Sequence, residues 1–270
     1  MAIITISRGS YSMGKRVAEL AADRLGYSLI SREVLLEASH QFNIPEIKLE
    51  KAIHDAPGIL ERYSHKKQTY VAFIRSALVE KVLQNDIIYH GLAGHLLLKG
   101  VEHVLKVRIT TSMENRVAYV MAQEGISAHD AEVRIQKDDQ ERRKWTRDLY
   151  GEDPWDSSLY DLTIRIDKLT IDQAVDFICQ AANNEGFSTS EKSLQQLKDL
   201  SIACYVKAEL VQDAPDIGVS CEYGNVLIYI KSREHLSGKL TRRIEEMRHG
   251  KKEIFNIEVH TGSLVPKNSV

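Results

Sequence analysis

The chain has 270 residues, more than one compact domain usually contains, so we expect one large domain and one small one. The 36 lysines and arginines nearly balance 38 aspartates and glutamates, and the formal charge of −2 argues against a general attraction to nucleic acid or anionic lipid. Three cysteines without a C-x-x-C pair indicate neither a disulfide framework nor a zinc site, and they favour a cytoplasmic location. No nucleic-acid partner is expected, and any anion site must be local.

The first predicted elements are a buried strand and a helix. Residues 2–7 form an apolar, β-branched run that stops at Arg8, as a buried strand does. A helix is predicted from about Gly14, because apolar residues then recur on one face until Gly26, a typical helix stop. The start of the chain also lacks the basic leader and long apolar core of a signal peptide.

The loop between these elements satisfies G-x-x-x-x-G-K, the pattern of a phosphate-binding loop. Glycines let the backbone curl and bring its N–H groups close to phosphates, the helix N-terminus adds partial positive charge, and a lysine adds a full one. The residues predicted to bind ATP are Gly9, Ser10, Tyr11, Ser12, Met13, Gly14, Lys15 and Arg16. The alternative is a βα turn with an exposed lysine.

Magnesium binding is the less regular part of this motif. The Ser or Thr that commonly follows the lysine and helps to hold Mg²⁺ is absent, since Arg16 occupies that position. Ser10 or Ser12 could replace it, or phosphates and water could hold the ion. No protein metal site is expected, because the histidines show no H-E-x-x-H spacing.

Further apolar runs at 27–30, 86–90, 103–110 and 161–166 alternate with helical stretches. This alternation predicts an α/β fold with a mostly parallel sheet covered by helices. The runs are too short or too interrupted for a transmembrane segment. Two or three helices are expected in the insertion at 42–85. Helix starts are predicted at Thr111, Ser127 and Thr170, each followed three residues later by Glu114, Asp130 or Gln173, and helix ends at Gly125 and Gly151.

The helix predicted at 128–150 is rich in arginine. Phosphoryl transfer depends mainly on positioning and on neutralising phosphoryl oxygens, which arginines on a mobile helix can do. Arg142, Arg143 and Arg147 are the catalytic candidates, and Asp139 is spaced to orient Arg142 or Arg143. A solvated, salt-bridged surface helix would have a similar sequence. The nearby aromatic residues, such as Trp155, are expected to pack in the core rather than to stack on a base.

The composition changes at a polar, turn-rich stretch, which predicts domains at 1–183 and 193–262, a linker at 184–192 and a tail at 263–270. Helical and strand patterns beyond the linker predict a small domain of αββαβ order.

Taken together, Ile3 to Arg8 with the glycine loop, residues 31–35, Asp139-x-x-Arg142, and residues 160–169 resemble the cytidylate-kinase-like family. The resemblance spans about 2–182 and implies a P-loop kinase fold that uses ATP and Mg²⁺ and phosphorylates a nucleoside monophosphate, CMP or dCMP above all. It implies that Arg32 opens the monophosphate region, that Arg116 also contacts substrate, and that Asp139 and Arg142 belong to a lid. For Arg116 the alternative is a solvent-facing arginine without a role in binding. Leu92 stands where similar proteins carry an arginine.

Residues 193–261 resemble a BON domain, which implies a phospholipid or protein partner for the C-terminal domain. The absent loop Ser/Thr and Leu92 leave open a second hypothesis, a catalytically degenerate nucleotide sensor that signals through this domain. A third hypothesis is that the C-terminal domain dominates as a lipid or protein adaptor.

Overall fold

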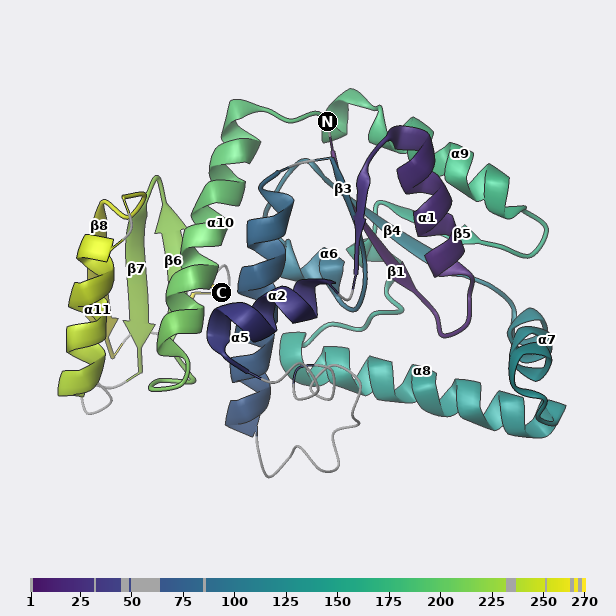
Figure 1. The fold of residues 1–270 in the computed structure, drawn as a ribbon, viewed down its shortest axis with the longest axis horizontal. Coiled ribbons are helices and arrows are strands. Elements are labelled where there is room, and N and C mark those ends of the chain that lie inside the picture. Colours follow the sequence, from purple (N-terminus) through teal and green to yellow (C-terminus); the bar gives the residue numbers. More distant parts are fainter. Residues whose placement is uncertain are drawn as a thin grey trace.

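The computed structural model describes residues 2–31, 33–44, 49, 64–84, 86–231, 237–250, 252–262, 265–266 and 269–270. Within these residues two sheets are present, one in the strand order β2-β3-β1-β4-β5 and a smaller one in the order β6-β7-β8 (Figure 1). The strands of the first sheet are β1 (Ile3–Arg8), β2 (Ser28–Ile30), β3 (Ile87–His90), β4 (Val104–Thr110) and β5 (Leu162–Arg165). All of its pairings are parallel, as the apolar runs predicted.

Helices cover both faces of this sheet. Neighbouring residues of β1 point to opposite faces, and nearly all of them are buried because helices lie on each side. Ile4 and Ile6 pack with α1 (Gly14–Leu25) and α9 (Ile171–Ala182). Ile3 packs on the other side with α2 (Glu33–Phe42) and α5 (Ser64–Val82). The remaining elements of this part are α6 (Gly94–Leu97), α7 (Met113–Glu124), α8 (Ala128–Tyr150), and the short 3-10 helices η2 (Ser157–Leu159) and η3 (Glu185–Phe187).

Most predicted helix ends are confirmed. Gly26, Gly125 and Gly151 adopt left-handed conformations after α1, α7 and α8, and Ser127 and Thr170 cap α8 and α9. The predicted start at Thr111 is wrong by one residue, since Ser112 accepts from the Asn115 N–H. The Thr111 hydroxyl is used elsewhere, 2.6 Å from the Ile166 carbonyl and 2.8 Å from the Asp167 carboxylate at the end of β5.

The predicted insertion at 42–85 is described only in part. It contains the end of α2 and all of α5, whereas residues 45–48 and 50–63 lie outside the described residues. Arg32 lies outside them as well. No helix in the described chain is both long enough and apolar enough to cross a bilayer.

The C-terminal part has the predicted αββαβ order: α10 (Glu191–Leu210), β6 (Gly218–Glu222), β7 (Asn225–Ile230), α11 (Gly238–Gly250) and β8 (Asn256–Thr261). Strand β6 runs antiparallel to β7, and β8 runs parallel to it. The carboxylate of Asp199 on α10 accepts from the backbone N–H groups of Tyr223 and Gly224, at 3.0 Å each, and so fixes the β6–β7 turn.

Helix α10 lies between the two parts of the molecule (Figure 1). Leu197, Cys204 and Ala208 pack into the core beneath α5. Ile202 and Val206 pack into the core of the smaller sheet. One helix therefore supplies both cores.

Candidate active site

The phosphate loop follows β1 at the carboxyl edge of the parallel sheet. The Gly9 N–H donates to the Ile109 carbonyl of β4, and the buried Ser12 hydroxyl lies 2.9 Å from the Gly9 carbonyl and 3.0 Å from that of Ile109. A Cβ on Gly14 would lie 2.8 Å from the Cβ of Arg8, so only glycine fits there. Sequence reasoning assigned the unusual dihedrals to the glycines, but the left-handed residues are Tyr11 (φ 57°) and Met13 (φ 61°).

A buried ion pair joins this loop to α7 and α8. Arg116 of α7, which is 8% exposed, donates from Nε to the Ser10 carbonyl at 2.7 Å and from Nη2 to Asp139 at 2.7 Å. Asp139 of α8 in turn accepts from the Ser10 N–H at 3.2 Å. Asp139 therefore pairs with Arg116 and not with Arg142 or Arg143, and Arg116 is not the solvent-facing residue that the alternative interpretation assumed.

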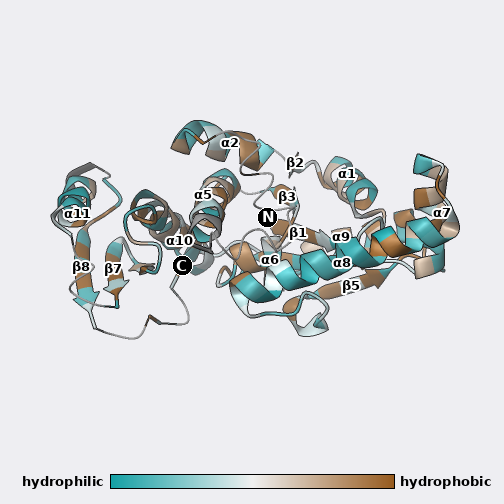
Figure 2. Cartoon of the chain, turned by 90° about the horizontal axis from the view of Figure 1, so that it is seen from below, coloured by the Kyte–Doolittle hydropathy of each residue, from teal (hydrophilic) through white to brown (hydrophobic). Residues whose placement is uncertain are grey.

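Helix α8 covers the loop at a second point. The Tyr11 hydroxyl donates to Asp138 at 3.0 Å. The outward face of α8 is largely hydrophilic (Figure 2), whereas Ala131, Ile135 and Trp145 on its inner side belong to apolar clusters. Polar contacts at Ser10 and Tyr11 add to this packing in holding the arginine-rich helix against the loop.

A small cavity lies between the loop, the segment after β3 and α8. It has a volume of about 40 Å³, room for a few water molecules but not for a nucleotide. Its walls come from the β1 end, the β3–α6 turn, β4, α8 and the segment before β5: Ser7, Arg8, Gly9, Gly91, Leu92, Ala93, His95, Arg108, Asp139, Arg142, Thr146, Pro154, Trp155 and Tyr160. A nucleotide would fit there only if one of these walls moved.

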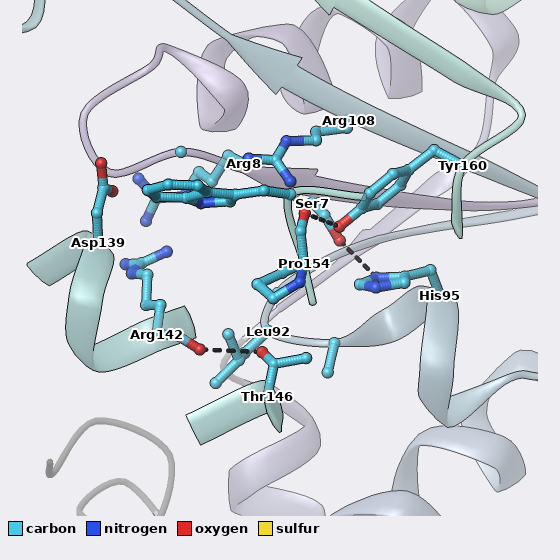
Figure 3. Close-up of a pocket in the computed structure, with 14 residues that line it drawn as sticks. Ser7, Arg8, Leu92, His95, Arg108, Asp139, Arg142, Thr146, Pro154 and Tyr160 are labelled. Carbon is cyan, nitrogen blue, oxygen red and sulfur yellow. Dashed lines mark hydrogen bonds between the residues drawn. The ribbon is translucent and has the colours of Figure 1, made fainter. Parts of the chain in front are cut away.

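Three guanidinium groups from three different elements meet at this cavity: Arg8 of β1, Arg108 of β4 and Arg142 of α8 (Figure 3). Burial and the neighbouring Arg142 lower the pKa of Arg8 to about 10, and burial lowers the pKa of Arg108. Among the described residues, no carboxylate lies within salt-bridge distance of any of the three. Arg108 instead lies over the Tyr160 ring, 5.6 Å from its centroid. The cluster therefore gathers positive charge that no carboxylate of the described residues neutralises by direct contact.

Two buried histidines line the same edge of the sheet. His95 Nδ1 lies 2.9 Å from the Ser7 hydroxyl, and its ring lies 4.6 Å from that of Tyr160. Burial, followed by nearby cations, lowers the pKa of both His90 and His95 to about 3. Both imidazoles are therefore neutral at physiological pH, and neither adds positive charge to the arginine cluster.

The predicted lysine of the loop lies outside the cavity. The Lys15 side chain is 76% exposed and its ammonium lies 3.8 Å from Glu19 on the next helical turn. Arg16 is also exposed and contacts Glu19 at 3.6 Å. Such exposed pairs hold a side chain weakly, so Lys15 is free to reorient toward the loop.

Of the three arginines predicted on α8, the structure brings only Arg142 to the cavity. Arg143 donates to Asp153 from Nε at 3.1 Å and from Nη2 at 2.6 Å, and Arg147 donates to the same carboxylate at 2.5 Å. These hydrogen bonds hold the pKa of Asp153 well below its usual range. The Arg143 guanidinium also lies 4.2 Å from the centroid of Trp155. The expectation that the nearby aromatic residues pack in the core is confirmed for Trp145, which is 4% exposed, and is wrong for Trp155, which is 51% exposed.

Sequence reasoning did not select Arg8, Arg108 or Tyr160 as site residues. A signal exists for Arg8, because it stands between the first strand and the first loop glycine. Arg108 and Lys106 are the two charged residues of a mostly apolar strand, and within the described chain only Lys106 has a carboxylate partner, Asp161 at 3.8 Å. A partly buried charge without such a partner is costly unless it has a function.

The loop also offers a hydroxyl for a magnesium ion. Ser12 is engaged within the loop, but the buried Ser10 hydroxyl has no hydrogen-bond partner in the described part of the chain. The described side chains bring together no group of three or more His, Cys, Asp or Glu that could hold a metal by themselves. The residues fit a Mg²⁺ ion that arrives with phosphates.

Comparison with known proteins gives matches over the larger part of the chain. The model of the cytidylate kinase-like family matches residues 3–168. A cytidylate kinase from Methanopyrus kandleri is 30% identical over 173 residues, which cover 61% of this chain and 82% of that protein. A solved structure of an uncharacterized protein from Eubacterium ventriosum has a TM-score of 0.53 at 20% identity and covers 68% of this chain and 100% of its own. A shikimate kinase from Acinetobacter baumannii has a TM-score of 0.39 at 12% identity, covering 67% of this chain and 92% of its own.

Proposed function

Because the chain belongs to the cytidylate kinase-like family, we propose that it transfers the γ-phosphoryl group of ATP to a nucleoside monophosphate, with CMP or dCMP as the preferred acceptor. The observation that carries the proposal is the convergence of Arg8, Arg108 and Arg142 on one cavity beside the phosphate loop. Three guanidinium groups without carboxylate partners suit the phosphate of an acceptor and the charge that develops on a transferring phosphoryl group.

The loop residues divide the work of holding ATP. Backbone N–H groups of 10–14 and the N-terminus of α1 receive phosphate oxygens, and Lys15 adds a mobile charge once it leaves Glu19. The Asp139 carboxylate already accepts from the Ser10 N–H, which supports an anion-binding role for this amide. The Ser10 hydroxyl would hold a Mg²⁺ ion that arrives with ATP, and the ion would neutralise phosphate charge.

Arg142 links opening and chemistry in this proposal. It lies on α8, the helix whose Asp138 and Asp139 contact the loop, so the same movement that admits substrate withdraws this arginine. When α8 closes over bound substrates, Arg142 returns to the phosphoryl group and water is excluded. Leu92 lines the same cavity, and Arg8 and Arg108 supply the charge that it lacks.

A coupled assay of ADP release with CMP, dCMP, UMP, AMP and GMP tests the proposal. We expect the highest kcat/KM with CMP or dCMP, and a loss of about 100-fold in Lys15→Ala, typical of removing one group that stabilises the transition state. Lys99→Ala, which removes a lysine on the surface away from the cavity, is the matched control. Absence of acceptor-dependent turnover, with Lys15→Ala indistinguishable from the parent, would contradict the proposal.

The second candidate is a nucleotide sensor without turnover. It is favoured by the absence of a Ser or Thr after Lys15 and by Leu92, which lines the cavity where similar proteins carry an arginine. Calorimetry that detects ATP binding while all five acceptors give no ADP would select it. Turnover with any of them would exclude it.

The expectation of a phospholipid or protein partner for the C-terminal part remains a prediction. Tyr223 and Phe255, which are 63% and 75% exposed, are the apolar side chains through which such a partner would bind. Co-sedimentation of the full chain with phosphatidylglycerol vesicles tests the lipid version, and Phe255→Ser should abolish it.

A further inference from the structure

A second cavity lies between the two parts of the molecule, away from the phosphate loop. It has a volume of about 370 Å³, within the range of small-molecule sites. Helices α5 and α10, the last residues of α8 and the segments flanking the smaller sheet form its walls. Apolar side chains cover much of it, among them Val71, Ala72, Leu149, Ile217 and Val265.

Two cations face this apolar cavity from opposite helices. Arg75 of α5 uses its Nε to donate to the Leu97 carbonyl at 2.9 Å. Lys207 of α10 donates to the carbonyls of Ile217 and Pro215. No carboxylate of the described chain lies within 4 Å of either group. Asp216 also lines the cavity, but it is paired with Lys231 at 3.7 Å and offsets the charge of Lys207 only in part.

Burial without a counter-ion is costly for such groups, and burial lowers the pKa of Lys207 to about 8. The Tyr150 ring lines the same cavity, and its buried hydroxyl has no partner in the part of the chain that the structure describes. Carbonyl oxygens satisfy hydrogen bonds but do not neutralise charge, so the cavity combines apolar walls with unbalanced positive charge.

We propose that this cavity binds a small organic anion, a carboxylate or phosphate monoester that carries an apolar chain, with its charged group between Arg75 and Lys207. An anion there supplies the missing counter-charge, while the apolar body occupies the wall formed by Val71, Ala72 and Ile217. Inorganic anions lack the apolar body, and neutral alcohols lack the charge. Both should therefore bind more weakly.

Isothermal titration calorimetry of the full chain with hexyl phosphate, hexanoate, 1-hexanol and inorganic phosphate tests this assignment. Saturating ATP is present to occupy the phosphate loop. We expect one site for hexyl phosphate or hexanoate. 1-Hexanol, which lacks the charge, and inorganic phosphate, which lacks the apolar chain, should bind at least about 10-fold more weakly. The affinities of hexyl phosphate and hexanoate, compared with each other, show which head group the site prefers. Lys207→Met and Arg75→Met should each weaken the anion by about 10-fold or more, as expected for a charge-assisted hydrogen bond.

Two further variants separate the site from general effects. Ala72→Leu fills the cavity while both cations remain, so it should abolish binding of the hexyl probes. Lys99→Met removes a lysine outside this cavity and should change nothing. Each variant must retain the parent's unfolding temperature within a few degrees. If Lys207→Met or Arg75→Met does not fold, the loss of binding in Ala72→Leu tests the site instead. Failure of both anions to bind at 10 mM, or equal binding to parent and Ala72→Leu, would overturn the assignment.

Discussion

The guanidinium groups of Arg8, Arg108 and Arg142 raise the free energy of the protein without ligand, because like charges are brought together in a partly buried place. Burial lowers the pKa of both Arg8 and Arg108, and the neighbouring Arg142 lowers that of Arg8 further. An anion of two negative charges removes most of the repulsion. The same groups that are unfavourable alone therefore become binding groups for a phosphate.

Replacing Arg142 should separate binding from folding. We expect Arg142→Gln to lower kcat/KM by about 100-fold, since one donor to the phosphoryl oxygens is lost. Its free energy of unfolding should equal that of the parent or exceed it by up to about 0.5 kcal/mol, because one like charge is removed and no described carboxylate pairs with Arg142. The control is Arg242→Gln, which removes an 82% exposed arginine from α11. Equal kcat/KM in the two variants would contradict a role in transfer.

In contrast to the arginine cluster, the buried charges of Asp139 and Arg116 neutralise each other. Their side chains are only 14% and 10% exposed, so loss of one partner leaves a buried charge. We expect Asp139→Asn to lower the free energy of unfolding by about 3 kcal/mol, measured by urea denaturation. Glu246→Gln, which breaks an exposed pair with Arg242, should cost less than about 0.5 kcal/mol. If both cost the same, the pair contributes no more than a surface contact.

The role of a residue could be predicted where a chemical function requires a motif of neighbouring residues. The glycine loop was found from spacing alone, and the placement of Gly14 against Arg8 explains why that glycine is needed. The partner of Asp139 was not predictable, because Arg116 lies 23 positions away on another helix, whereas the nearer Arg142 and Arg143 satisfied the helical spacing. Local spacing cannot reveal which residues two packed helices bring together.

At the scale of elements, β3 and α6 carry the groups that make stability depend on pH. The folded protein binds protons on His90 and His95 only near pH 3, whereas the unfolded chain does so below the ordinary value of 6.5. As the pH falls through this window the unfolded state gains protons first, so stability is lost. Above about pH 7 both states are neutral and these residues contribute no pH dependence.

The expected slope is about 1.4 kcal/mol per pH unit for each histidine between pH 6 and pH 4, on top of any contribution from carboxylates. His95→Gln should reduce the slope by that amount, measured by urea denaturation at several pH values. His129→Gln, an exposed residue on α8, is the control and should leave the slope unchanged. A parent whose stability is flat between pH 6 and pH 5 would refute the neutral, buried state of both rings.

Elements were predictable because their signals are local. Apolar runs set the strands to within about a residue or two, and glycine stops set the helix ends. The start of α7 was missed because Thr111 and Ser112 are both good caps, and the choice depends on the end of β5, where Thr111 binds. That competition is decided by tertiary structure.

At the scale of the whole molecule, α10 connects the two parts more closely than a polar linker suggests. Its residues on one side belong to the core beneath α5, and those on the other side belong to the core of the smaller sheet. The αββαβ order followed from the sequence, but the sharing of α10 did not, because an apolar residue does not reveal which neighbour it contacts. We therefore expect both parts to unfold in one transition.

A substitution in one part, read by a probe in the other, tests this coupling. Both tryptophans, Trp145 and Trp155, lie in the first part, whereas Ile228 is fully buried in β7. Ile228→Ala should lower the free energy of unfolding by about 3 kcal/mol and shift the urea midpoint seen by tryptophan fluorescence. An unshifted tryptophan transition would show that the parts unfold independently. Val259→Ala, at a 37% exposed position in β8, is the control with a small expected effect.

Because α10 contributes to both cores, the chain cannot be cut on either side of this helix into two separately folded domains. A fragment that ends before Glu191 would expose the apolar side of α5 that α10 covers. A fragment that ends after Leu210 would expose Ile202 and Val206, which the smaller sheet covers. Either fragment would expose to water an apolar surface that is buried in the full chain, and we expect it to aggregate.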